Sequence, residues 1–169
     1  MIQGIIFDMD GTLLDTERIL VQCWIKSAAL YGFSMKEQHA LNIRSLQHCL
    51  AESYLKSIFG ESFNYDAIRQ TRKKLFAEEL EKNGVPVKQG VLPFLQFCRS
   101  KNLPTIVATA TAQKNAVQYL ERSGILPYFT EIVGGDQITV GKPFPDIYLA
   151  AAKAIHQNPS CCMALEDAP

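Results

Sequence analysis

The chain has 169 residues, enough for one hydrophobic core or a core with a small second domain, but not for three domains. Hydrophobic residues make up 47% of the sequence and charged residues 20%, which excludes a disordered or fibrous protein. The 17 basic residues balance the 17 acidic ones, and no run of like charge is long enough to bind a nucleic acid or a membrane surface. We therefore expect a folded protein whose partner is a small molecule.

Signals for export or membrane insertion are absent from the sequence. No apolar run approaches the roughly 18–20 residues that span a bilayer. The first residues, MIQGIIFD, lack the basic segment and the cleavage site of a secretory signal. The five cysteines are odd in number and scattered among apolar neighbours, which favours reduced thiols over disulfides. These features predict a cytoplasmic protein.

The first predicted element is a buried strand at residues 2–8, a short β-branched run that ends in acidic residues. Four helical stretches follow without a convincing strand between them, and three of them end before a glycine. They cover residues 16–31, 34–43, 45–59 and 64–83. The second opens with a predicted capping box that runs from Ser34 to Glu37.

Strands and helices alternate in the rest of the chain. Helices are predicted at residues 90–102, 113–123 and 145–156, and strands at 105–108, 131–133 and 162–165. This alternation indicates an α/β fold of parallel βαβ units with right-handed crossovers. We expect an α/β core from residues 1–15 and 85–169, and a helical domain at 16–84 inserted after the first strand. In such sheets the ligand binds beyond the carboxyl ends of the strands.

Four acidic residues crowd the stretch FDMDGTLLDTE that follows the first strand. Asp8 could be a nucleophile, a metal ligand or a helix cap, and an isolated aspartate would most simply be a cap. Asp10 argues against capping, because two neighbouring carboxylates repel each other unless a cation or a shared task holds them there. Gly11 permits a turn that brings Asp10 back beside Asp8, and the hydroxyl and amide of Thr12 could receive phosphate oxygens.

These residues resemble the first motif of the haloacid dehalogenase-like phosphohydrolases. Three further positions match the family's pattern in order: Thr109 in IVATAT, Lys142 in GKPFPD, and the pair Glu166 and Asp167 in ALEDAP. Taken singly, Lys142 would be a solvated surface lysine and the acidic pair a solvated turn, but the joint order favours the functional interpretation. The resemblance covers the whole chain and implies a Rossmann-like core.

The resemblance also implies roles for the motif residues. Asp8 would attack phosphorus and form an aspartyl-phosphate, which splits one difficult transfer into two easier ones. Asp10 would protonate the leaving oxygen and later accept a proton from water. Thr109 and Lys142 would hold the phosphoryl oxygens, and Lys142 would offset the charge of the nucleophile.

A Mg²⁺ site is the second implication of the resemblance. Asp8, the backbone carbonyl of Asp10, and Asp167 would bind the ion, with Glu166 contacting it through water. The charges agree with a cation, because four carboxylates face the single positive charge of Lys142 and would otherwise repel a phosphate dianion.

Other candidates for substrate binding lie beside the motifs. Gly11 and Thr12 follow the first acids, and Ala110 and Thr111 follow the second motif. Helix capping explains Thr111 equally well.

The helical insert resembles the small cap of the β-phosphoglucomutase-like branch of the family. Residues 15–17 would then form a hinge that lets the cap close. Arg44 and Ser45, between two helices of the insert, could face the substrate, although a surface arginine explains Arg44 equally well. The mutases of this branch carry a histidine shortly after the hinge, whereas residues 18–20 are Arg, Ile and Leu here. This difference favours hydrolysis of a small phosphate monoester, such as a sugar phosphate, with a sugar phosphate mutase as the alternative.

The end of the sequence gives the last expectation. Members of the family usually continue beyond the fourth motif, whereas this sequence stops at Pro169. We expect the fourth strand to lie at an open edge of the sheet. The protein would then be a monomer, a weak homodimer whose second copy covers the edge, or a truncated and catalytically weak fragment.

Overall fold

The computed structural model describes residues 1–44, 46 and 48–167. Ser45 and Pro169, both named above, lie outside these described residues. The chain divides into two compact units. The first, called here the α/β unit, comprises Met1–Thr16 and Gly84–Pro169, and the second, called the helical unit, comprises Glu17–Asn83.

The elements follow the order expected from the sequence. In the α/β unit they are β1 (Gly4–Phe7), α5 (Val91–Ser100), β2 (Thr105–Thr109), α6 (Gln113–Arg122), η1 (Leu126–Tyr128), β3 (Ile132–Gly134), η2 (Gly135–Gln137), α7 (Asp146–Ala154), η3 (Pro159–Cys161) and β4 (Cys162–Leu165). In the helical unit they are α2 (Glu37–Asn42), α3 (His48–Phe59) and α4 (Tyr65–Asn83), preceded by α1 (Thr16–Leu30), whose first residue belongs to the α/β unit.

The four strands form one parallel sheet in the order β3-β2-β1-β4. The chain moves from β1 outward through β2 to β3 and then crosses back to place β4 on the other side of β1. The direction of the strand order therefore reverses between β1 and β4, and in open α/β sheets such a reversal marks the ligand site. The predicted α/β fold with a parallel sheet is confirmed.

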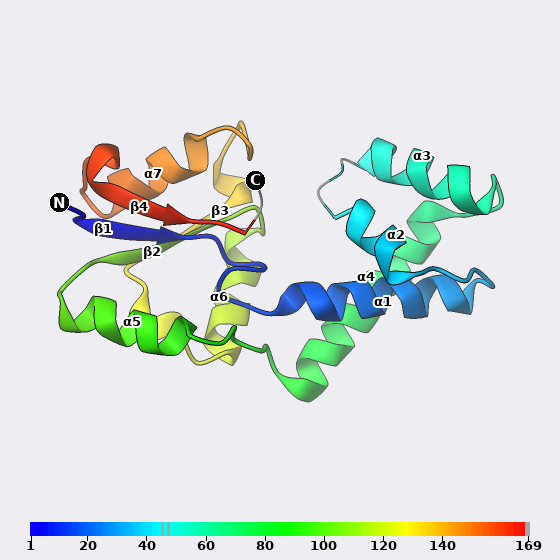
Figure 1. Cartoon of the computed structure of the whole chain (residues 1–169), viewed down its shortest axis with the longest axis horizontal. Helices are drawn as coiled ribbons and strands as arrows, with labels where there is room; N and C mark the ends of the chain where they lie inside the picture. Colours follow the sequence, from blue (N-terminus) through cyan, green and yellow to red (C-terminus); the bar gives the residue numbers. More distant parts are fainter. Residues whose placement is uncertain (45, 47, 168–169) are drawn as a thin grey trace. The chain divides into compact units, whose positions relative to one another are not determined.

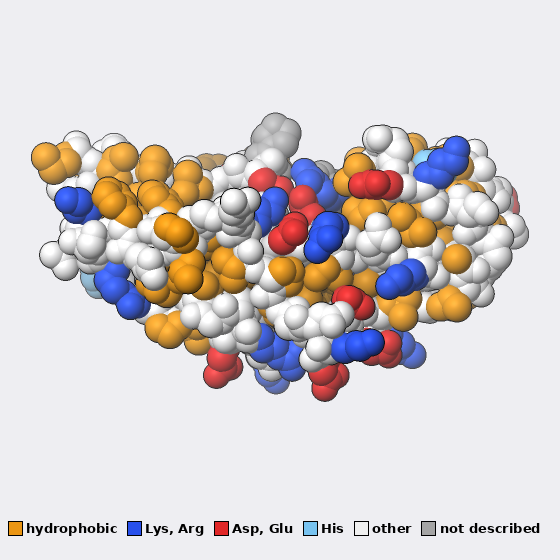
Figure 2. Space-filling model, turned by 60° about the horizontal axis from the view of Figure 1, so that its bottom comes forward, with side chains coloured by type: hydrophobic (Ala, Val, Ile, Leu, Met, Phe, Trp, Pro, Cys, Tyr) orange, Lys and Arg blue, Asp and Glu red, His pale blue; other side chains and the backbone are white. Residues whose placement is uncertain are grey.

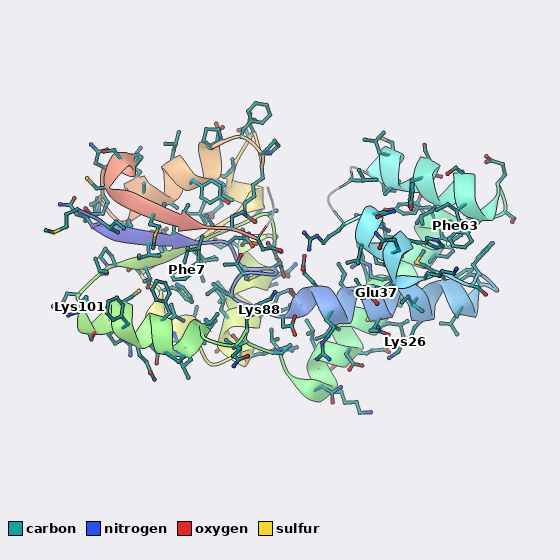
Figure 3. The ribbon with its side chains drawn as sticks, in the orientation of Figure 1. Phe7, Lys26, Glu37, Phe63, Lys88 and Lys101 are labelled. Atoms are coloured by element: carbon teal, nitrogen blue, oxygen red, sulfur yellow. The ribbon has the colours of Figure 1, made fainter. Side chains whose placement is uncertain are left out.

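Helices cover both faces of the sheet, with α7 on one face and α5 on the other (Figure 1). Alternate residues of β1 point to opposite faces. Ile6 belongs to the core beneath α7, together with Ile147 and Ala151 of that helix. Phe7, labelled in Figure 3, points toward α5 and packs edge-to-face against Phe94 at 5.9 Å between ring centroids. The buried sheet thus holds β1 rigidly on both sides.

The edge strand β4 is less covered than the central strands. β1 and β2 are buried along their whole length, whereas every described residue of β4 is half-buried or exposed. This agrees with the expectation that the fourth strand forms an edge. Figure 2 shows hydrophobic side chains gathered on one face of the α/β unit, whose exposed large hydrophobic residues include Leu92 and Phe97 of α5.

The helical unit has a hydrophobic core of its own. Phe63, labelled in Figure 3, is fully buried and stacks on Phe59 at 5.2 Å, while Trp24 stacks on Tyr65 at 5.7 Å. The other buried residues of this core are Val21, Ala28, Met35, Ala40, Ile43, Ala51, Leu55 and Ile68. In the part of the chain that is described, no helix combines the length and the apolar character needed to cross a membrane.

The predicted capping box at Ser34 is wrong. Helix α2 begins at Glu37, and Lys36 before it has an extended backbone with φ −96° and ψ 159°. The physical reason is the packing of the preceding segment, because Phe33 packs against Phe63 at 4.9 Å and Met35 is buried in the same core. Residues 33–36 place both side chains without forming helix, so the helix starts later.

Candidate active site

The predicted polar residues gather at one edge of the sheet. Asp8 directly follows β1, Thr109 ends β2, and Glu166 and Asp167 follow β4. Because the strands are parallel and β1 is hydrogen-bonded to both β2 and β4, these carboxyl ends lie side by side. The amide of Asp8 donates to the carbonyl of Leu165 at 2.9 Å, which ties the end of β1 to the end of β4.

Lys142 joins two of the carboxylates. Its Nζ donates to Asp8 Oδ1 at 2.5 Å and to Glu166 Oε2 at 2.5 Å. Only 22% of the Lys142 side chain and 7% of the Asp8 side chain are exposed, so this contact is largely shielded from water. The loop before α7 therefore brings a fixed positive charge to the end of β1.

Burial and hydrogen bonding together set the pKa values of this pair. Burial raises the pKa of Asp8 to about 7, even though the hydrogen bond and the charge of Lys142 act to lower it. Burial also acts to lower the pKa of Lys142, but the hydrogen bonds to Asp8 and Glu166 outweigh that effect and raise it above its ordinary value. Lys142 is therefore a cation at any physiological pH.

Asp10 is held separately, by two hydroxyl groups. Thr16 Oγ1 donates to Asp10 Oδ1 at 2.8 Å, and Thr111 Oγ1 donates to Asp10 Oδ2 at 2.9 Å. Thr16 is 3% exposed and Thr111 is half-buried. Each oxygen of the Asp10 carboxylate therefore accepts a hydrogen bond from a hydroxyl that is at least partly shielded from water. The expected turn exists, because Gly11 has a φ of +90° and its amide donates to the carbonyl of Leu14 at 2.9 Å.

Gly11 also makes room for Asp167. A Cβ at position 11 would collide with Oδ2 of Asp167, so the carboxylate lies directly against the glycine. Asp8, Glu166 and Asp167 each offer a carboxylate oxygen, and the three oxygens lie within 4.8 Å of one another. Hard oxygen ligands in such a cluster suit Mg²⁺. The donor set therefore fits the ion that the sequence predicts, with the side chain of Asp10 outside the cluster.

The remaining candidates in this unit surround the same edge. Thr109 is buried, and its Oγ1 accepts a hydrogen bond from the amide of Thr111 at 3.1 Å. Ala110 is exposed, and its carbonyl lies closely against Gly135. Thr12 Oγ1 is buried without a hydrogen-bond partner among the described residues, so a polar donor is available next to the acidic turn.

Arg44 belongs to the helical unit. Its Nη1 pairs with Glu17 Oε1 at 2.5 Å within that unit. Ser45, its predicted neighbour in substrate binding, lies outside the described residues. The role of Arg44 toward a substrate stays a prediction.

Two residues, Tyr148 and Thr16, contact the site in ways that the sequence does not predict. The hydroxyl of Tyr148, in the first turn of α7, donates to Glu166 Oε2, and its ring centroid lies 5.1 Å from Lys142 Nζ. Burial, followed by the contact with Glu166, raises the pKa of Tyr148 to about 12. The sequence indicates Thr16 only as part of a hinge, whereas its hydroxyl donates to Asp10. No local spacing in the sequence signals these contacts, because each depends on how the folded chain turns the side chain toward the motif residues.

Comparison with known proteins agrees with the arrangement of these residues. A family model of haloacid dehalogenase-like hydrolases matches residues 2–169. A phosphorylated carbohydrates phosphatase from Thermotoga maritima is 31% identical, over 98% of this chain and 76% of its own length. Hexitol phosphatase A from Escherichia coli is 27% identical, over 99% of this chain and 75% of its own length. A solved structure from Thermotoga maritima, provisionally named a β-phosphoglucomutase, has a TM-score of 0.80 at 27% identity, covering 99% of this chain and 77% of that one.

The parallel sheet flanked by helices defines an α/β protein, with a lysine and a carboxylate cluster beyond the carboxyl edge of the sheet. This chain belongs to the haloacid dehalogenase-like hydrolase family. Its fold is shared with the β-phosphoglucomutase-like members, as the resemblance of the motifs predicted. The protein is accordingly a hydrolase.

Proposed function

We propose that this hydrolase is a Mg²⁺-dependent phosphatase that acts on a small phosphate monoester, with sugar phosphates as the substrate class. The observation that carries the proposal is the bridge of Lys142 between Asp8 and Glu166, beside the carboxylate of Asp167. A nucleophilic carboxylate, a fixed cation and a set of oxygen ligands are the parts that phosphoryl transfer needs. The names of the two phosphatase relatives, one acting on phosphorylated carbohydrates, support the substrate class.

Asp8 is the proposed nucleophile. One of its carboxylate oxygens attacks phosphorus, the bond from phosphorus to the alcohol oxygen breaks, and an aspartyl-phosphate forms on Asp8. Water then attacks the same phosphorus, which releases phosphate and restores the carboxylate. Lys142, held at 2.5 Å from Asp8, offsets the negative charge that gathers between the carboxylate and the phosphoryl group.

Asp10 is the proposed general acid and base. It donates a proton to the leaving alcohol oxygen and later accepts one from the attacking water. The hydroxyls of Thr16 and Thr111 suit this change of state, because a hydroxyl can both donate and accept a hydrogen bond. The side chain of Asp10 can therefore keep its position whether or not it carries the proton.

Asp8, Glu166 and Asp167 would hold the Mg²⁺, together with the backbone carbonyl of Asp10. When bound, the ion neutralises the carboxylates and polarises the phosphoryl oxygens. The charge balance supports this requirement, since four acidic side chains gather at this edge of the sheet and the positive charge of Lys142 pairs with two of them, Asp8 and Glu166.

Thr109 is proposed to bind a phosphoryl oxygen. Its hydroxyl accepts a hydrogen bond from the amide of Thr111, which uses a lone pair and leaves its proton to donate. The hydroxyl of Thr12 is a second candidate donor, because it is buried without a partner among the described residues. Ala110 would contribute backbone contacts, and Gly11 the close approach of its own backbone.

We propose that residues 1–15 and 85–169 serve as the catalytic core and residues 16–84 as a cap that selects the substrate. Arg44 would exchange its partner Glu17 for an anionic group or a sugar hydroxyl of the substrate. A sugar phosphate mutase is the second candidate, favoured by the 27% identity to the provisional β-phosphoglucomutase. Cytoplasmic location, and a monomeric or weakly dimeric state, stay predictions.

A screen of phosphorylated metabolites with and without Mg²⁺ tests the proposed function. We expect phosphate release from one or more sugar phosphates, abolished by EDTA and restored by Mg²⁺. Full activity in EDTA would contradict the metal requirement, and no release from any monoester would contradict the phosphatase. Isomerisation of a sugar phosphate that requires an added sugar bisphosphate would favour the mutase.

A further inference from the structure

Tyr148 contacts two residues of the proposed site in two different ways. Its hydroxyl donates to Glu166 Oε2, the same oxygen that accepts from Lys142 Nζ at 2.5 Å. Its ring lies beside the ammonium group of Lys142, at 5.1 Å from the centroid, within the range of a cation–π interaction. A single side chain therefore restrains both the carboxylate and the cation.

The place of Tyr148 in the fold makes it a better anchor than either residue it contacts. Glu166 follows an edge strand and is exposed, and Lys142 lies in the loop before α7. Tyr148 is on α7, which is fixed to the sheet through the buried residues Ile147 and Ala151. Groups on rigid elements position a site more precisely than groups on loops. Tyr148 therefore links the Glu166 and Lys142 side chains to a helix that is packed on the sheet.

We propose that Tyr148 is a positioning residue that orients Glu166 toward the bound Mg²⁺ and directs Lys142 toward Asp8. The inference rests on the proposed function, because it assumes that the acidic cluster binds the ion. Partners of this kind, which hold a ligand without touching the metal, typically contribute about 10–100-fold to metal affinity or activity. In this proposal the hydroxyl of Tyr148 holds Glu166, and the ring holds the ammonium group of Lys142.

Tyr148→Phe isolates the hydroxyl, because phenylalanine keeps the ring beside Lys142 and the packing of α7. Tyr128→Phe is the matched control. Tyr128 is also half-buried in the α/β unit, but its ring faces the Arg99 guanidinium at 4.1 Å, near the opposite end of β2. Both variants lose one phenol hydroxyl, and only one of them loses a contact with Glu166.

The first readout is the Mg²⁺ dissociation constant of the substrate-free protein by calorimetry, and the second is kcat on the best substrate of the screen. We expect Tyr148→Phe to bind Mg²⁺ about tenfold more weakly and to lower kcat, as is usual for such partners. We expect Tyr128→Phe to match the wild type in both. The thermal unfolding temperature of each metal-free variant separates loss of positioning from loss of fold.

The outcomes are distinguishable. If the wild type binds Mg²⁺ and Tyr148→Phe binds it within a factor of about two, the inference is overturned while the proposed function stands. An equal loss in Tyr128→Phe also overturns it, since the effect would then be general. If the wild type itself binds no Mg²⁺, the proposed function fails and the inference fails with it.

Discussion

Replacing Lys142 with methionine probes the contact on which the proposed function depends. The methionine side chain is flexible and has a volume similar to that of lysine, so the change mainly removes the ammonium group. The wild-type Nζ makes two hydrogen bonds of 2.5 Å to carboxylates, with 22% of the side chain exposed. Hydrogen bonds to charged groups contribute about 1.5–3 kcal/mol each to stability. Loss of one donor to a developing charge typically lowers kcat by about 10²–10³-fold.

We therefore expect Lys142→Met to lose about 10²–10³-fold in kcat, the effect of one lost donor to the phosphoryl group. The measurement is Mg²⁺-dependent phosphate release from an aryl phosphate at saturating metal. Lys153→Met is the matched control, because Lys153 is an exposed lysine on α7 and belongs to no part of the proposed site. It should leave the rate unchanged.

The same variant gives a second readout in the metal-free protein. Removal of the Lys142 charge removes an influence that lowers the pKa of Asp8, so that pKa should rise above about 7. A rate for Lys142→Met within a factor of about ten of the wild type would refute the reasoning, because it would mean that the ammonium group is not needed for the transition state.

Three further predictions concern the acids and the turn. Asp10→Asn should lose about 10²–10⁴-fold in kcat, the usual contribution of general acid–base catalysis, while calorimetric Mg²⁺ binding persists; an unchanged rate would remove Asp10 from the mechanism. Because the pKa of Asp8 is raised from 3.8 to about 7, its contribution to the stability of the metal-free protein is complete below pH 3.8 and is lost as the pH rises through about 7. Mg²⁺ binding should accordingly release protons between those values, as calorimetry in two buffers of different ionisation enthalpy would detect; no release at pH 6 would contradict the shift. Gly11→Ala should weaken Mg²⁺ binding, since φ is +90° and the new Cβ would meet the Asp167 carboxylate; an unchanged dissociation constant would show that the contact is dispensable.

Much of the α/β unit could be predicted because its signals are local. The strands at β1, β2, β3 and β4 are short apolar runs that end in polar residues, and the parallel order follows from the helices between them. The same logic predicted that Asp8, Glu166 and Asp167 would meet, because the carboxyl ends of parallel strands share one edge, whereas the place of Lys142 followed only from the resemblance to the family's motifs. The structure brings these four residues together.

The other features of the site and the start of α2 depend on contacts that no local pattern encodes. The hydroxyl of Tyr148 reaches Glu166 only because α7 packs on the folded sheet, and Thr111 reaches Asp10 across 101 positions of sequence. The start of α2 was misplaced for a related reason, since burial of Met35 in the core of the helical unit overrides a local capping signal. Tertiary packing, rather than propensity, decides these positions.

The central claim is that Asp8 is the nucleophile. Its most direct test is the rate of Mg²⁺-dependent hydrolysis by Asp8→Asn, which keeps the shape of the side chain but replaces the attacking oxygen with an amide. The change leaves Asp10, Lys142 and the fold in place, as the unfolding temperature should show. We predict that turnover falls to the uncatalysed background. Turnover by the well-folded variant at a rate close to that of the wild type would contradict the account.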